Sequence, residues 1–143
     1  MSSTNAIVSR AQLRGFRATP QKSRRVVDLV RGQRADLALN MMCFANQPEL
    51  GKAIYDLISS AVANAKQSNP GLRDASQLWV VEALVDEGFT MKRFRARAQG
   101  RGYPINKRSS QITITLSDDR KFRTNAKKAT GTETLKSKEG EAK

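Results

Sequence analysis

Residues 78–116, LWVVEALVDEGFTMKRFRARAQGRGYPINKRSSQITITL, decide the fold of this chain. Residues 78–85 are mostly β-branched, aromatic or apolar and include no proline or glycine, which favours a strand. Residues 110–116 alternate aliphatic side chains with threonine, and this period of two predicts a second strand with its isoleucines on the core face. The two strands can pair only if the residues between them double back, because a structureless loop of that length is unusual in a compact domain. The pattern therefore predicts a long β-hairpin over about residues 86–105.

The middle of the predicted hairpin is basic. Residues 88–103 give each arm about eight residues and a reach of about 25 Å. They carry five cations and no acid. Because an unpaired guanidinium loses roughly several kcal/mol of hydration on burial, this segment must face water or a polyanion. A two-stranded ribbon is marginal in water on its own, so we expect the partner to order it. The cations are Lys92, Arg93, Arg95, Arg97 and Arg101, and Phe89, Met91, Phe94 and Tyr103 lie between them.

Two aromatic residues near the hairpin each allow two interpretations. Phe94 lies between Arg93 and Arg95 and could stack on an unpaired base or pack across the strands of the hairpin. The sequence favours neither of these. Trp79 could also be a stacking platform, but its place in a dense apolar strand favours the core.

Charge is distributed unevenly along the 143 residues, which carry a net charge of +13. Residues 9–34 hold eight cations and one acid, residues 35–87 three cations and seven acids, and residues 88–117 seven cations and no acid. Such sorting indicates a polyanionic partner, with nucleic acid first and an anionic membrane second. No apolar run approaches the ~18 residues of a membrane span, and we predict no membrane partner. The candidate binding residues of the first basic block are Arg10, Arg14, Arg17, Lys22, Arg24 and Arg25.

Helices are predicted for most of the sequence between the two basic blocks. Thr19 can cap a first helix that begins at Pro20 and ends before Gly32. Asp36 can cap a second helix over roughly residues 37–44. Residues 48–68 space their apolar side chains three or four apart and give the strongest helix prediction.

The predicted fold class follows from these elements. Residues 6–14 are expected to form a short extended segment before the first helix. We predict an α+β domain over residues 1–117, in which three helices pack on a small antiparallel sheet with one long protruding β-hairpin. Residues 118–143 are rich in Lys, Thr, Gly, Ser and Glu and are predicted to be a polar, disordered, basic C-terminal tail.

Patterns for catalysis and metal binding are absent from the sequence. The chain has no histidine and a single cysteine, Cys43, which excludes histidine-dependent catalysis, zinc clusters and an internal disulfide. Asp86 and Glu87 are neighbours on a strand and point to opposite faces, so they make a poor acid–base pair. We predict no enzyme, no cofactor and no metal site.

Cys43 lies in an apolar run and is expected to be buried. The first ten residues lack the hydrophobic region of a signal peptide, and we expect a cytoplasmic protein.

Three segments together resemble a known family. They are ATPQKSRRVVDLVRG at residues 18–32, SAVANA at residues 60–65, and DEGFTMKRFRARAQGRGYPINKRSSQITITL at residues 86–116. Their order and spacing are similar to those of the bacterial large-subunit ribosomal protein twenty-two family. The resemblance extends almost continuously over residues 6–117. The chain departs from the usual family pattern at Phe89, Ala96 and Gln111, and together with Pro104 these leave the local path of the hairpin open.

The resemblance implies a function and a set of site residues. It implies a structural protein that binds large-subunit rRNA, assists early subunit assembly and lines the nascent-peptide exit tunnel with its hairpin tip. The implied partners are rRNA, neighbouring ribosomal proteins and the nascent peptide, and no homo-oligomer is expected. The tip would comprise Met91, Lys92, Arg93 and Phe94. The RNA-facing residues would include Arg95, Arg97, Arg101, Lys107 and Arg108 on the hairpin, and Thr19, Gln21, Lys22, Arg24 and Arg25 on the first helix.

A cationic DNA-binding or architectural protein is the alternative hypothesis. Basic β-ribbons also enter DNA grooves, and a net charge of +13 suits any polyanion. Affinity for duplex DNA compared with folded ribosomal RNA discriminates between the two hypotheses.

Overall fold

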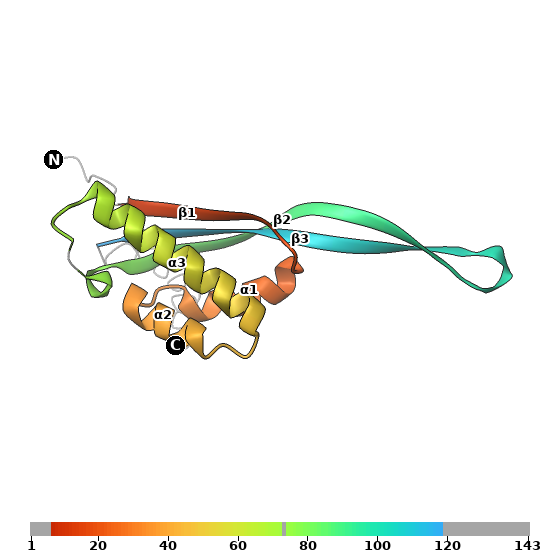
Figure 1. Cartoon of the computed structure of the whole chain (residues 1–143), viewed down its shortest axis with the longest axis horizontal. Helices are drawn as coiled ribbons and strands as arrows, with labels where there is room; N and C mark the ends of the chain where they lie inside the picture. Colours follow the sequence, from red (N-terminus) through yellow and green to blue (C-terminus); the bar gives the residue numbers. More distant parts are fainter. Residues whose placement is uncertain (1–6, 73, 119–143) are drawn as a thin grey trace, which may run out of the picture.

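The computed structural model describes residues 7–72 and 74–118 and has the predicted α+β architecture. Three helices cover one face of a three-stranded sheet, and two of the strands continue into a long hairpin (Figure 1). Apart from Asp118, the predicted C-terminal tail lies outside the described residues. In chain order the elements are β1 (Ile7–Phe16), α1 (Pro20–Val30), α2 (Ala35–Cys43), α3 (Pro48–Ser68), a 3₁₀ turn η1 (Ala75–Gln77), β2 (Trp79–Ala96), a second turn η2 (Ala98–Gly100) and β3 (Gly102–Ser117).

The sheet is antiparallel, and its last strand in the chain lies in the middle, in the order β1-β3-β2. Strand β1 ends at Phe16, opposite Ser110 of β3. Strands β2 and β3 continue to pair beyond that point as far as Ala96 and Gly102. The eight residues of β3 from Gly102 to Ser109 therefore belong to a two-stranded ribbon, which at about 3.3 Å per residue reaches about 25 Å beyond the body.

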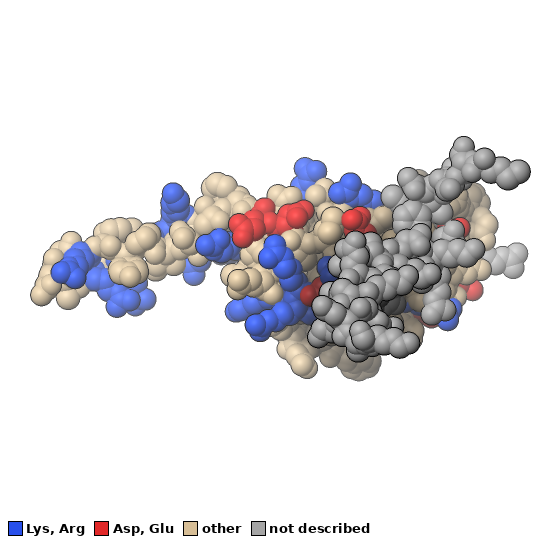
Figure 2. Space-filling model, turned by 180° about the vertical axis from the view of Figure 1, so that it is seen from behind, with Lys and Arg blue, Asp and Glu red and all other residues tan. Residues whose placement is uncertain are grey.

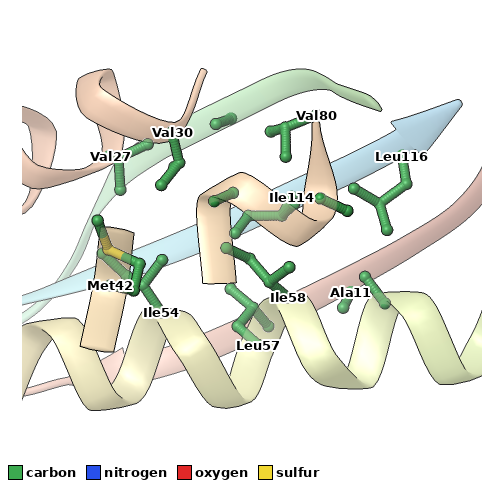
Figure 3. Packing of buried hydrophobic residues seen from close by; sticks show 14 of the residues in the cluster. Ala11, Val27, Val30, Met42, Ile54, Leu57, Ile58, Val80, Ile114 and Leu116 are labelled. Atoms are coloured by element: carbon green, nitrogen blue, oxygen red, sulfur yellow. The ribbon is translucent and has the colours of Figure 1, made fainter. Parts of the chain in front are cut away.

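The core lies between the sheet and the helices (Figure 3). Ile112, Ile114 and Leu116 of β3 are fully buried, which confirms the alternation predicted from the sequence. Ile114 faces α3, where Ile54 and Ile58 are also fully buried. Thr113 and Thr115 point to the opposite face and are buried as well, because β3 has a neighbouring strand on each side and its short threonines lie between longer side chains.

Helix ends differ from the sequence predictions in their details. Thr19 occupies the N-cap position of α1, but its side chain makes no capping hydrogen bond. Gly32 follows α1 with a φ of 74°, a left-handed conformation that suits glycine and ends the helix. Helix α2 begins at Ala35 after Arg34, so Asp36 lies in the first turn and is not the cap. Its carboxylate accepts a hydrogen bond from the Leu37 amide at 2.8 Å.

Two side chains expected in the core lie elsewhere. Cys43 is exposed, because it falls on the outer face at the end of the short helix α2. Trp79 is half-buried at the first position of β2, where the Arg34 guanidinium lies 6.0 Å from the ring centroid. Both predictions of burial relied on apolar neighbours in the sequence. Such neighbours do not determine which face of a helix or strand points toward the core.

Candidate nucleic-acid interface

The hairpin presents its cations to solvent. All seven are exposed, as predicted for a segment that faces water or a polyanion. Of these seven, only Arg108 lies near an acid in the described part of the chain, with its Nη1 at 4.0 Å from Oε2 of Glu87. Arg93 donates to the Lys92 carbonyl oxygen at 3.0 Å, and the Arg97 guanidinium lies 6.0 Å from the centroid of the Tyr103 ring. These contacts orient guanidinium groups without neutralising them, so their charge remains available to phosphates.

The turn of the hairpin lies further along the chain than the sequence analysis placed it. Gln99 and Gly100 form the turn, with φ angles of 61° and 69°. Met91, Lys92, Arg93 and Phe94 were predicted at the tip, and the structure places them in the β2 arm. Met91 pairs with Lys107, Lys92 with Asn106, Arg93 with Ile105, and Phe94 with Pro104.

The reason for this difference is the strand pairing. Strand β2 keeps its partner through Ala96, so the chain reverses only over Arg97–Arg101. Two consecutive left-handed residues make the tight reversal, and glycine adopts this conformation without steric cost. The cations nearest the tip are therefore Arg97 and Arg101.

Phe94 packs across the strands of the hairpin, which is one of the two roles that the sequence left open. Its ring lies directly over Gly102 on the opposite arm, where a side chain on residue 102 would collide with it. The residue nevertheless remains 77% exposed. The ring is thus held against one strand while most of its surface stays accessible, an arrangement that suits stacking on an unpaired base.

The first basic block is also exposed, but its residues divide into two groups. Arg10, Arg14, Arg17, Lys22 and Arg25 have no acidic partner within 4.0 Å in the described residues, and Thr19 and Gln21 are exposed beside them. Arg24 differs, because its Nε and Nη2 donate to the carbonyl oxygen of Val85 at 3.3 and 3.2 Å. It therefore also ties α1 to β2.

Two further arginines join elements of the body. Arg31 donates to the Ala83 carbonyl oxygen at 2.7 Å and pairs with Asp28 at 2.7 Å. Arg34 donates to the Ser76 carbonyl oxygen at 3.0 and 2.8 Å. Neither was predicted as a binding residue, and their contacts agree with a structural role.

A groove joins the two basic blocks at the root of the hairpin. Its volume is about 650 Å³. Its walls come from residues 16–19 with Lys22, from residues 46–50, and from Met91 with residues 106–109. Seen from behind, Lys and Arg side chains gather where the hairpin leaves the body (Figure 2). Segments about 90 residues apart in the sequence thus form one basic surface.

Gly51 allows the wall formed by residues 46–50 to lie close to α2. A Cβ atom on residue 51 would come within 2.8 Å of the Met42 carbonyl oxygen and of the Ala45 Cβ. Since real Cβ atoms do not approach that closely, a glycine at this point lets α3 begin beside the end of α2. The start of α3 is thereby held next to the groove.

A family model described as ribosomal protein L22p/L17e matches residues 11–117. The chain belongs to the ribosomal protein L22p/L17e family. It is similar to the large ribosomal subunit protein uL22 of Acidothermus cellulolyticus, with 53% identity over 109 residues. The matched part is 74% of this chain and 38% of that protein, so the chain spans well under half the length of this relative.

Membership of the L22p/L17e family decides several of the sequence predictions. A ribosomal protein of this family is a structural component and not an enzyme, as predicted, and its place is the cytoplasmic ribosome. Within residues 7–72 and 74–118, no helix is long and apolar enough to cross a membrane. The same residues contain no group of three or more His, Cys, Asp or Glu side chains that could hold a metal ion.

Proposed function

We propose that this chain is a structural component of the large ribosomal subunit that binds large-subunit rRNA through its hairpin and its first basic block. The observation that carries this proposal is the acid-free segment of residues 88–117, whose seven exposed cations have one weak acidic contact among the described residues, that of Arg108 with Glu87. A surface of this kind repels itself until a polyanion neutralises it. The membership of a ribosomal protein family supports rRNA as that polyanion.

RNA is favoured over duplex DNA by the aromatic residues of the hairpin. Phe94 and Tyr103 are 77% and 64% exposed. Bases that can stack on such rings are found in the loops and bulges of folded RNA, whereas those of duplex DNA are already stacked. Arginine beside these rings adds flat, forked donors for phosphates.

The body and the hairpin have different parts in this proposal. The globular body binds RNA at the surface of the subunit, and the hairpin extends about 25 Å into it. Because an isolated two-stranded ribbon is marginal in water, RNA completes its order. Binding of one protein to RNA segments along both its body and its hairpin brings those segments together, which assists early subunit assembly.

Sedimentation of a lysate from cells that produce the chain tests this function. We expect the chain to sediment with large subunits, and purified chain to prefer folded large-subunit rRNA over duplex DNA of equal length by at least about tenfold at 0.15 M salt. Both affinities fall with salt because counterions are released, so the ratio is the informative quantity. A chain that sediments apart from large subunits, or that prefers the duplex, contradicts the proposal.

The far end of the hairpin is proposed to line the nascent-peptide exit tunnel. The turn at Gln99 and Gly100 is the part of the described chain furthest along the hairpin, so it replaces Met91–Arg93 as the proposed tip. A photoreactive amino acid at Gln99 is expected to crosslink to nascent chains in translating ribosomes. The same amino acid at Gln77, in the η1 turn of the body, serves as the control and is expected to give none. Crosslinks from residue 77 and none from residue 99 would contradict this placement.

A further inference from the structure

The groove at the root of the hairpin is a concave site within a largely convex basic surface. Its volume of about 650 Å³ falls in the range of small-ligand sites, roughly 300–1,000 Å³. A duplex presents a wide convex surface and cannot enter such a space, whereas a single nucleotide can. The shape therefore points to one unpaired nucleotide and not to a continuous helix.

Four cations and one acid, Glu49, line the groove, so its charge is positive on balance. Arg17 lies in the loop before α1, and Lys22 lies in the first turn of α1. Lys107 and Arg108 lie in β3. Arg17, Lys22 and Lys107 have no acid within 4.0 Å in the described residues. These walls can hold the phosphates on both sides of one nucleotide, since charge-assisted hydrogen bonds to phosphate are among the stronger ones.

The inner surface of the groove suits a base. Phe16 and Met91 are half-buried and line it, so each leaves part of an apolar or aromatic side chain accessible. Asn46, Gln47 and Asn106 also line the groove and carry amides that can donate to and accept from a base edge. An apolar surface with a few amides and a cationic rim is how proteins hold bases turned out of an RNA helix.

We propose that this groove binds a single unpaired nucleotide of RNA, with its base between Phe16 and Met91 and its flanking phosphates on Lys22 and Lys107. The proposal rests on the proposed function, because it names the structural feature of the RNA that one part of the interface recognises. It assigns to the groove a selectivity for bulged or extruded bases. The hairpin cations outside the groove add affinity that depends little on whether the RNA has a bulge.

A pair of RNA stems tests the proposal on the full chain. One stem carries a single bulged 4-thiouridine, and the other is the same stem without the bulge. We expect the bulged stem to bind about tenfold more tightly, since stacking and edge contacts are made to the bulged base alone. Irradiation should crosslink the thiouridine to peptides that contain residues 46–50 or 106–109. Equal affinity for the two stems, or crosslinks confined to the Arg97–Arg101 turn, overturns the proposal.

Matched lysine variants separate the groove from general electrostatics. Lys22→Ala with Lys107→Ala removes one cation from each of two walls of the groove, and Lys52→Ala with Lys66→Ala removes the same charge from exposed positions on α3. The first pair is expected to reduce the tenfold preference to about twofold, and the second to leave it near tenfold. If both pairs change the preference equally, the groove does not hold the nucleotide. Failure of the proposed function looks different, because neither stem would then bind better than duplex DNA.

Discussion

Simultaneous replacement of Arg95, Arg97 and Arg101 by alanine is expected to lower affinity for large-subunit rRNA by about 100-fold at 0.15 M salt. The three side chains are exposed on the outer half of the hairpin and have no acidic partner in the described residues. If each contributes one phosphate contact of about 1 kcal/mol, their loss weakens binding by about 3 kcal/mol. The slope of log affinity against log salt should also become shallower by about three. Binding measured at several salt concentrations checks both values.

The arginine variant has two controls. Lysine at the same three positions keeps the charge, so most of the affinity and nearly all of the salt slope should remain, and only the forked guanidinium contacts are lost. The alanine variant should also melt at the temperature of the parent chain, because none of the three residues contacts the core. Unchanged affinity, or a clear fall in melting temperature, would show that these residues serve the fold and not the RNA.

Ile114→Ala is expected to destabilise the body by about 3–5 kcal/mol. Ile114 is fully buried in the central strand, and its neighbours across the sheet are Ala11 on β1 and Ala83 on β2. Because both neighbours are small, the isoleucine side chain fills the space between the sheet and α3 (Figure 3). Alanine at this position would leave a cavity, which the sheet and the helix could close only by moving together. Since total stability of a domain is typically about 5–15 kcal/mol, this loss is a large fraction of it, and the melting temperature should fall clearly. Urea unfolding gives the change in free energy directly.

Leu84→Ala is the matched control for the core variant. Leu84 belongs to the same sheet but is 41% exposed, so truncation removes less buried surface. We expect a loss of about 1 kcal/mol or less. Equal losses at the two positions would mean that the buried face of the sheet is not the one that stabilises the body.

The features that could be predicted from the sequence were those fixed by local pattern. The helix Pro48–Ser68 has the predicted bounds, because its apolar spacing runs without interruption and proline marks its start. The hairpin followed from two strong strand patterns that had to meet, and the exposure of its cations followed from the cost of burying charge. These inferences need no knowledge of tertiary contacts.

The features that could not be predicted from the sequence depend on how far the strands pair and on which face of an element points toward the core. The turn at Gln99 and Gly100 carries only a weak local signal, since a single glycine beside glutamine is not a strong hairpin dipeptide. Its position is set by how far β2 and β3 stay paired. The structural role of Arg24 depends on the Val85 carbonyl oxygen, 61 residues away. The groove was missed for the same reason, because its walls meet only in three dimensions.

The position of β3 in the sheet has a consequence for the order of events during synthesis. The first strand made, β1, and the second, β2, are not neighbours in the sheet, because β3 lies between them. Ile7 pairs with Ser117 and Phe16 pairs with Ser110. The sheet of the body therefore cannot be completed until β3 has been translated. Contacts between such distant residues make folding slow, and strands without partners are prone to aggregate in the meantime. We therefore expect this small body to fold slowly for its size, and only after β3 has been synthesised.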